Sequence, residues 1–139
     1  MFAGTDLEAQ RPIRVLLVED SVVLAERLRE LLMQIPDVEL VGSADNERNA
    51  IALARTSSPD AIILDLHLKQ GTGFGVIRAL RVVRHAPQII VLTNYALPQY
   101  KREAESLGVQ FFLDKARDFH RIPDILREIT VPTDEGPIR

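Results

Sequence analysis

Short, continuous apolar runs alternate with helix-like segments along most of this chain. The runs are rich in Val, Ile, Leu or Phe and cover residues 13–18, 38–43, 61–64, 88–93 and 109–113. A continuous apolar run, unlike one in which polar and apolar residues alternate, is typical of a parallel strand that is buried on both faces. Strands and helices in alternation predict the α/β class, with five strands and five helices.

The segments between the runs have the residue spacing of amphipathic helices. In the first segment, Leu24, Leu28, Leu31 and Leu32 recur at helical intervals, with charged residues on the opposite face. We expect helices over residues 24–35, 46–55, 73–85, 98–107 and 122–129. Right-handed crossovers would fold this order into a (βα)5 doubly wound five-stranded parallel sheet with helices on both faces.

Length and composition limit the class of protein further. The chain has 139 residues, and we expect one domain over residues 13–130, with flexible extensions at residues 1–12 and 131–139. It has no cysteine, which excludes disulfides, thiolate metal sites and cysteine nucleophiles. No apolar run approaches the roughly 18 residues that a membrane span requires, so we expect a cytoplasmic protein without membrane insertion. The net charge of -3 gives no general attraction to phosphate backbones, and we expect no direct nucleic-acid binding.

Polar residues follow the expected strands at the points where the strands end. Glu19 and Asp20 follow the first strand, Asp65 the third and Lys115 the fifth, while Thr93 closes the fourth. The carboxyl ends of parallel strands meet at one edge of such a sheet, which is also where ligands bind. Three carboxylates at one edge repel one another unless a cation neutralises them. Oxygen ligands of this kind favour Mg²⁺.

With a metal in place, Asp65 could act as a nucleophile on phosphorus and form an aspartyl phosphate. The phosphoryl oxygens then need positive charge and hydrogen-bond donors, which Mg²⁺, Lys115 and the Thr93 hydroxyl can supply.

The motifs "LLVED", "IILDLHL…GTG", "VLTN" and "FFLDK" occur in that order, each at a strand end. In this respect the chain, from about residue 14 to residue 129, closely resembles the receiver domain of two-component response regulators. The resemblance implies a flavodoxin-like sheet with the strand order 2-1-3-4-5. It also implies a protein that catalyses only its own phosphorylation and dephosphorylation.

The resemblance assigns roles to the acidic residues and to the loop after Asp65. Asp65 would accept a phosphoryl group from a histidine kinase or a histidine phosphotransfer protein. Asp20 would bind Mg²⁺ directly and Glu19 through water, and the backbone carbonyl of His67 would be a further ligand.

The resemblance also implies how the signal would spread. Thr93 would hydrogen-bond the phosphoryl group, and Lys115 would pair with its oxygens. Phe112, three residues before the lysine, matches the family's switch aromatic, which turns inward as Thr93 moves. Strand alternation favours one core residue and one partly exposed residue at Phe111 and Phe112.

Several residues depart from the commoner family pattern. Lys69 replaces a proline after the acceptor, so we expect a looser and more basic loop. Ala116 replaces a proline after Lys115, so the usual cis peptide is not expected there. Asn94 replaces a smaller residue, and His67 and Tyr95 occupy positions that tune phosphoryl lifetime in this family. We expect Asn94 and Tyr95 to slow hydrolysis by shielding the site.

The output is expected to be a protein contact or the passage of the phosphoryl group to a histidine. No output domain follows residue 129, so the resemblance implies a stand-alone receiver. The family's usual signalling face would be formed by the fourth helix, the fifth strand and the fifth helix, for a downstream target or a homodimer. Its polar residues are Tyr100, Lys101, Arg102, Asp114, Arg117 and Arg121.

Other interpretations remain open beside this one. A pseudo-receiver would use the same fold without taking phosphate. A phosphatase with an aspartyl nucleophile needs a second acid two residues later, where this chain has His67. An electron carrier with the same sheet needs aromatics over a flavin, and here there are two Tyr and no Trp. His67 could bind Zn²⁺ or Fe²⁺. The glycines of "GTGFG" could cradle a phosphate, although a tight turn explains them better.

Overall fold

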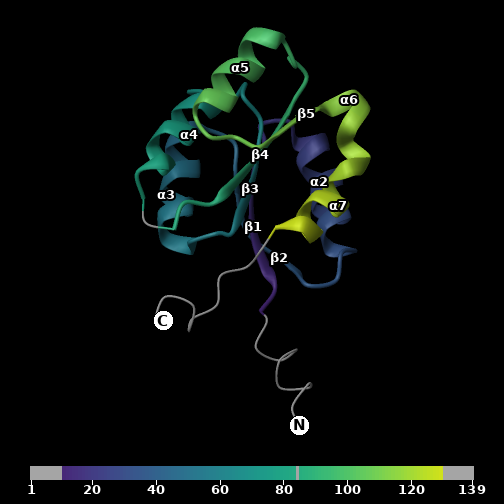
Figure 1. The fold of residues 1–139 in the computed structure, drawn as a ribbon. Coiled ribbons are helices and arrows are strands. Elements are labelled where there is room, and N and C mark those ends of the chain that lie inside the picture. Colours follow the sequence, from purple (N-terminus) through teal and green to yellow (C-terminus); the bar gives the residue numbers. More distant parts are fainter. Residues whose placement is uncertain (1–10, 84, 130–139) are drawn as a thin grey trace.

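A computed structural model describes residues 11–83 and 85–129. It contains a five-stranded parallel sheet in the order β2-β1-β3-β4-β5 (Figure 1). This confirms the predicted fold class and strand order. Most of the extensions predicted for residues 1–12 and 131–139 lies outside the described residues. The strands are β1 (Ile13–Val18), β2 (Val38–Ala44), β3 (Ala61–Leu64), β4 (Gln88–Thr93) and β5 (Phe111–Asp114).

Five helices of seven to twelve residues connect or follow the strands. They are α2 (Val22–Met33), α3 (Glu47–Ser57), α4 (Gly73–Arg81), α5 (Pro98–Ser106) and α7 (Ile122–Glu128). A short helix α6 (Lys115–Asp118) and a 3-10 turn η1 (Phe119–Arg121) lie between β5 and α7. In the described part of the chain, no helix is long and apolar enough to cross a lipid bilayer.

Several predicted boundaries are wrong by one to four residues, and local hydrogen bonds explain one of them. The fifth strand begins at Phe111 and not at residue 109, because the Val109 N–H donates to the Ala104 carbonyl (3.0 Å) and so closes the end of α5. The third helix ends at Arg81, and His85 adopts a left-handed φ of 59° that no helix can contain.

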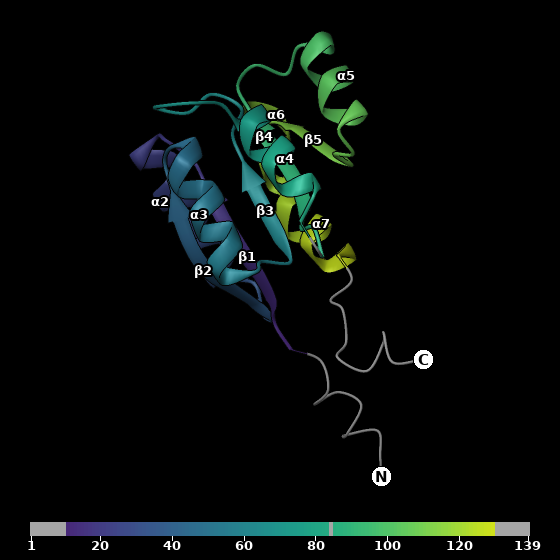
Figure 2. The same cartoon turned by 90° about the vertical axis from the view of Figure 1, so that its left-hand side faces the viewer.

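The sheet separates two apolar layers. One face packs against α2 and α7, and the other against α3, α4 and α5 (Figures 1 and 2). All four residues of β3 are buried, with at most 1% of their surface exposed. Burial of each large aliphatic side chain stabilises the fold by roughly 1.5–3 kcal/mol. Asp65, which follows this buried central strand directly, is therefore held by a rigid part of the fold.

Asp60 joins three strands at the amino-terminal edge of the sheet. Its Oδ2 accepts the N–H of Arg14 (2.8 Å), and its N–H donates to the Arg14 carbonyl (2.8 Å). Its own carbonyl accepts the N–H of Gln88 (2.9 Å), and its carboxylate accepts two hydrogen bonds from the Arg11 guanidinium (2.6 and 2.8 Å). Burial opposes ionisation, but the hydrogen bonds from Arg11 and Arg14 outweigh it and lower the pKa of Asp60.

Candidate functional site

Three carboxylates gather at the carboxyl ends of β1 and β3. One oxygen from each of Glu19, Asp20 and Asp65 lies within 4.8 Å of the others. The sheet places them, because the ladder continues one residue past the strands: Glu19 N–H donates to Ala44 (2.9 Å) and Asp65 N–H to Val18 (3.0 Å). Glu19 and Asp65 are each only 5% exposed. The predicted acid cluster is therefore formed.

Lys115 supplies a cation inside this cluster. Its Nζ lies 2.8 Å from Asp65 Oδ2 and 3.0 Å from Glu19 Oε1, and its side chain is 9% exposed. Burial alone would lower the pKa of Lys115, but its hydrogen bonds with Asp65 and Glu19 outweigh that effect and raise it. One ammonium faces three carboxylates, so the cluster keeps an excess of negative charge.

Lys115 is positioned by the turn that follows β5. The side chain of Asp114 caps α6 by accepting the N–H groups of Ala116 (2.8 Å) and Arg117 (3.1 Å). Asp118 in turn accepts the N–H of Asp114 (2.9 Å). The described residues contain no cis peptide bond, in agreement with the expectation from Ala116. This capped turn was not predicted from the sequence, although Asp114 followed by two helix-compatible residues is a cap signal.

Burial opposes the ionisation of Glu19. Its Oε2 accepts the N–H of Ser21 (2.9 Å), and Lys115 lies beside it. Burial nevertheless dominates and raises the pKa of Glu19 above its ordinary value of 4.5. A divalent cation at this edge would favour the charged form, because it would replace the solvent that the carboxylate has lost.

The other predicted groups border the same edge. Thr93 is fully buried at the end of β4, and its Oγ1 accepts the N–H of Tyr95 (3.1 Å). That bond uses the hydroxyl oxygen as an acceptor, so the hydroxyl hydrogen remains a potential donor. Asp65 Oδ1 accepts the N–H of His67 (3.2 Å), and Oδ2 holds Lys115. Both carboxylate oxygens of Asp65, the expected phosphoryl acceptor, are thus held in place by hydrogen bonds.

The segment after Asp65, residues 66–72, forms a tight turn, which we call the acceptor loop. An isolated bridge joins His67 to Thr72, and the N–H of Gly73 donates to the Leu66 carbonyl (3.0 Å). A Cβ at position 73 would lie 2.5 Å from the Asp65 carbonyl oxygen, so only glycine fits there. This close approach supports the turn interpretation of the "GTGFG" glycines.

Lys69 does not loosen the acceptor loop as its replacement of a proline predicted. Its N–H donates to the Asp45 carbonyl (3.2 Å), and its Nζ lies 3.3 Å from Asp45 Oδ2. Hydrogen bonds to Asn46 and Lys69 lower the pKa of Asp45. The basic side chain therefore helps to hold the loop against the start of α3.

His67 is exposed, and its imidazole lies against Tyr95, with ring centroids 4.2 Å apart. The potential metal cluster found in the described residues consists of Glu19, Asp20 and Asp65 and does not include this imidazole. The transition-metal interpretation of His67 therefore gains no support.

Phe111 and Phe112 are both half-buried, so the prediction of one core and one partly exposed residue is wrong. They do alternate between faces as strand geometry requires, since Phe111 packs on the layer of α2 and α7 and Phe112 on the other layer. Both lie in an edge strand that the neighbouring helices cover incompletely.

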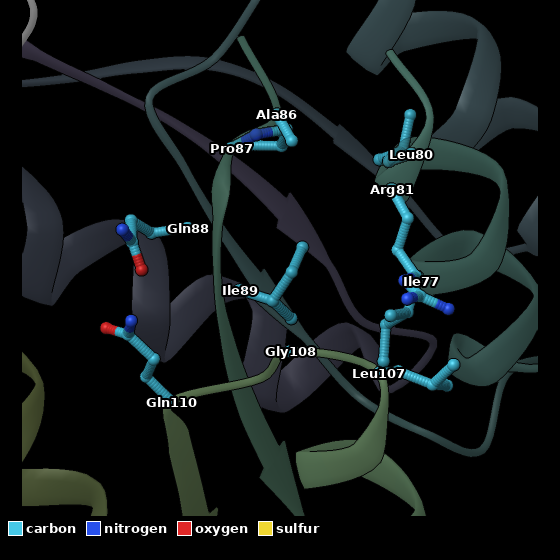
Figure 3. A pocket seen from close by; sticks show the side chains of 10 residues that line it. All are labelled: Ile77, Leu80, Arg81, Ala86, Pro87, Gln88, Ile89, Leu107, Gly108 and Gln110. Atoms are coloured by element: carbon cyan, nitrogen blue, oxygen red, sulfur yellow. The ribbon is translucent and has the colours of Figure 1, made fainter. Parts of the chain in front are cut away.

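A cavity of about 290 Å³ lies away from these groups, between the ends of α4 and α5 and the start of β4 (Figure 3). Its walls include Ile77, Leu80, Ile89 and Leu107, and it shares no residue with the carboxylate cluster. The cavity therefore lies near the amino-terminal edge of the sheet, and the carboxylate cluster lies at the carboxyl edge.

A sequence model of the response regulator receiver domain matches residues 15–127. The chain belongs to this family. Among curated relatives, it is 29% identical over 116 residues to the sensory transduction protein LytT of Bacillus cereus, covering 84% of this chain and 46% of that protein. It is 45% identical over 93 residues to a protein-glutamate methylesterase/protein-glutamine glutaminase of Myxococcus xanthus, covering 67% of this chain and 26% of that protein. The receiver therefore spans less than half the length of these relatives.

Solved structures agree with the receiver fold. The response regulator domain of CheB from Thermotoga maritima superposes with a TM-score of 0.78 at 22% identity, covering 88% of this chain and all of that one. The response regulatory domain of mrkE from Klebsiella pneumoniae gives 0.74 at 25% identity, covering 84% and 93% of the two chains. A DNA-binding response regulator of the LuxR family from Staphylococcus aureus gives 0.78 at 22% identity, covering 84% and 98%.

Proposed function

We propose that this receiver domain accepts a phosphoryl group on Asp65 from a histidine kinase or a histidine phosphotransfer protein. The observation that carries the proposal is the contact of Lys115 Nζ with Asp65 Oδ2 (2.8 Å) inside a cluster of three carboxylates. An ammonium held against one carboxylate oxygen is positioned to pair with phosphoryl oxygens once that carboxylate has reacted. A merely structural aspartate would have no need of two further buried or half-buried acids beside it.

The donor set fits Mg²⁺ because it offers hard oxygen ligands and an uncompensated negative charge. Asp20, Asp65 and the backbone carbonyl of His67 would hold the ion directly, and Glu19 would hold it through water. When bound, Mg²⁺ would neutralise charge on the phosphoryl oxygens.

In the proposed reaction, a carboxylate oxygen of Asp65 attacks phosphorus and the bond between phosphorus and the donor histidine nitrogen breaks. The electron pair of that bond stays on the imidazole, and the phosphoryl group becomes an acyl phosphate on Asp65. Lys115 pairs with one phosphoryl oxygen, and the buried Thr93 hydroxyl donates to another. Water later cleaves the acyl phosphate, so the domain catalyses only its own phosphorylation and dephosphorylation.

The proposed response is a movement of Thr93 and Phe112. Phe112 is half-buried against the layer of α4 and α5 and lies beside β4, where it pairs with Val91. A shift of Thr93 toward the phosphoryl group would open space for this ring to turn inward. The face formed by α5, β5 and α7 would then present a changed surface to a downstream protein or a second copy of the chain.

The proposal also includes the location of the protein and its partners. A cytoplasmic location fits the absence of cysteine, and a lack of direct nucleic-acid binding fits the net charge of -3. The stand-alone arrangement expected from the sequence stays a prediction. Output through a protein contact or through phosphoryl transfer to a histidine is part of the same proposal.

The test is incubation with a small phosphodonor and Mg²⁺, followed by intact mass measurement. We expect wild type to gain one phosphoryl group, Asp65→Asn to gain none, and the surface variant Asp124→Asn to behave as wild type. An adduct that survives in Asp65→Asn would place the acceptor elsewhere. No adduct in wild type, from either the small donor or a competent kinase, would favour the pseudo-receiver.

A further inference from the structure

Glu47, the first residue of α3, contacts the acceptor loop directly. Its Oε1 accepts the N–H of Thr72 (2.9 Å), and its own N–H donates to the Gln70 carbonyl (3.0 Å). The adjacent Lys69 N–H donates to Asp45 two residues before Glu47 (3.2 Å). Three of the seven residues of the loop are thus bonded to the start of α3.

Two glycines leave the space that the Glu47 side chain occupies. A Cβ at Gly71 would overlap Glu47 Cβ, and a Cβ at Gly75 would overlap the Glu47 carboxylate. Gly71 also has a φ of +81°, which favours glycine for a separate reason. Gly75 has no such backbone requirement and lies in the first turn of α4, where alanine would be the better helix former. Glycine at position 75 therefore leaves room for the Glu47 carboxylate in the position that it occupies.

The loop held in this way carries His67, whose carbonyl is proposed to bind the cation. The two ends of the loop are also joined, because the Gly73 N–H donates to the Leu66 carbonyl and Gly73 packs closely on the Asp65 backbone. The Thr72 side chain is already used to cap α4 by accepting the Gly75 N–H (3.1 Å). Glu47 is thus the side chain that holds the Thr72 backbone from outside the loop.

We propose that Glu47 is a positioning residue, which anchors the acceptor loop to α3 in the conformation in which His67 joins the cation site. This inference rests on the proposed function, because it concerns Mg²⁺ binding by the same cluster. Without the carboxylate, the Thr72 N–H loses its partner and the loop gains alternative conformations. The cation would then have to order the loop as it binds, which weakens its apparent affinity.

The test is an Mg²⁺ titration of the whole chain, followed through backbone amide signals in NMR spectra. We expect Glu47→Ala to raise the Mg²⁺ dissociation constant about tenfold, the lower end of the range for groups that support metal ligands. Glu47→Gln, which keeps an acceptor oxygen and the side-chain length, should restore most of the affinity. Glu26→Ala, which removes an exposed glutamate paired with Arg29 on α2, should bind Mg²⁺ as wild type does.

Two further readouts separate positioning from a general loss of stability. The NMR signal of the Thr72 amide proton should move to lower frequency in Glu47→Ala before any Mg²⁺ is added, because its hydrogen bond is lost. The midpoint of urea unfolding should fall too little in this variant to explain the loss of Mg²⁺ affinity. Gly75→Ala should weaken Mg²⁺ binding in the wild-type background, because its methyl group displaces the Glu47 carboxylate. In the Glu47→Ala background the same substitution should cause no further loss.

If wild type binds Mg²⁺ normally and Glu47→Ala binds it within about twofold as well, this inference alone is overturned, since the loss of a group that supports a metal ligand weakens binding by more than that. Independent, additive effects of Gly75→Ala and Glu47→Ala would also overturn it. A wild-type protein that shows no response to Mg²⁺ would overturn the proposed function and this inference with it.

Discussion

The rings of His67 and Tyr95 lie with their centroids 4.2 Å apart and their planes inclined by 39°. His67 belongs to the acceptor loop, and Tyr95 follows β4 with its N–H bonded to the Thr93 hydroxyl. The pair therefore joins two loops that border Asp65. Tyr95 is half exposed, at 51%, so the pair lies at the surface of the molecule, and we predict that it shields Asp65 from an attacking water.

Replacement of Tyr95 by alanine should shorten the life of the aspartyl phosphate. The substitution removes the ring that we expect to limit the access of water, so hydrolysis should become about threefold faster or more. The measurement is the loss of the adduct by intact mass after the phosphodonor has been removed. Tyr95→Phe keeps the ring and should hydrolyse at nearly the wild-type rate. A wild-type adduct lost within seconds, and no longer-lived than in Tyr95→Ala, would contradict shielding.

Removal of the buried ammonium should have opposite effects on stability and on cation binding. Lys115→Met leaves Glu19 and Asp65 without their shared partner, so we expect the free energy of unfolding without Mg²⁺ to fall by about 3–5 kcal/mol. The same change removes a competing positive charge, so Mg²⁺ should bind more tightly and restore part of the lost stability. Urea unfolding with and without Mg²⁺ measures both effects.

The matched control for Lys115→Met is Arg78→Met. Arg78 pairs with Glu103 at 2.6 Å, but both side chains are exposed, and exposed pairs contribute roughly 0–1 kcal/mol. The control should change the free energy of unfolding little and should not respond to Mg²⁺. Equal losses in the two variants would mean that the charge cluster has no special energetic role.

Binding of Mg²⁺ should weaken as the pH falls toward the raised pKa of Glu19. Burial raises that pKa above 4.5, so protons compete with the cation at a higher pH than they would for an exposed glutamate. Without Mg²⁺, the folded state favours the protonated form, and this stabilisation is lost as the pH rises through 4.5 and then through the folded pKa. Mg²⁺ titrations at several pH values, on wild type and Glu19→Gln, measure the competition. An identical pH dependence in both proteins would exclude Glu19 as its source.

Asp60 should stabilise the sheet at neutral pH and lose that effect in acid. Its folded pKa lies below the ordinary 3.8, so its contribution is complete above 3.8 and disappears as the pH falls through the folded pKa. We expect Asp60→Asn to lower the free energy of unfolding at pH 7 by about 1–3 kcal/mol, because the partly buried Arg14 N–H loses a charged acceptor. The measurement is urea unfolding at neutral and acidic pH. A loss that persists undiminished in acid would point to a different cause.

The sequence predicted the parts of the molecule that follow from strand order. Once the five apolar runs were assigned to a parallel sheet, Glu19, Asp65 and Lys115 had to meet at one edge, and they do. Helix ends were less predictable, because His85 and Val109 adopt their conformations through local backbone geometry that has no periodic signal.

The contact of Glu47 with Thr72 shows a different limit. The two residues are 25 positions apart, and the bond joins a side chain to a backbone amide, which leaves no pattern in the order of residue types. Glu47 in the first turn of a helix reads as an ordinary favourable charge near the helix amino terminus. Its second partner is visible only when the acceptor loop and α3 are seen together.

The glycines against Glu47 also restrict how this receiver can change over evolutionary time. While position 47 carries a long acidic side chain, a mutation that adds a methyl group at position 75 meets the carboxylate. Once position 47 has become small, alanine at position 75 gains helix stability, and a glutamate restored at position 47 would then have to place its carboxylate elsewhere. Substitutions at positions 47 and 75 should therefore occur together between related lineages. The change at position 47 should precede the change at position 75 more readily than it follows it.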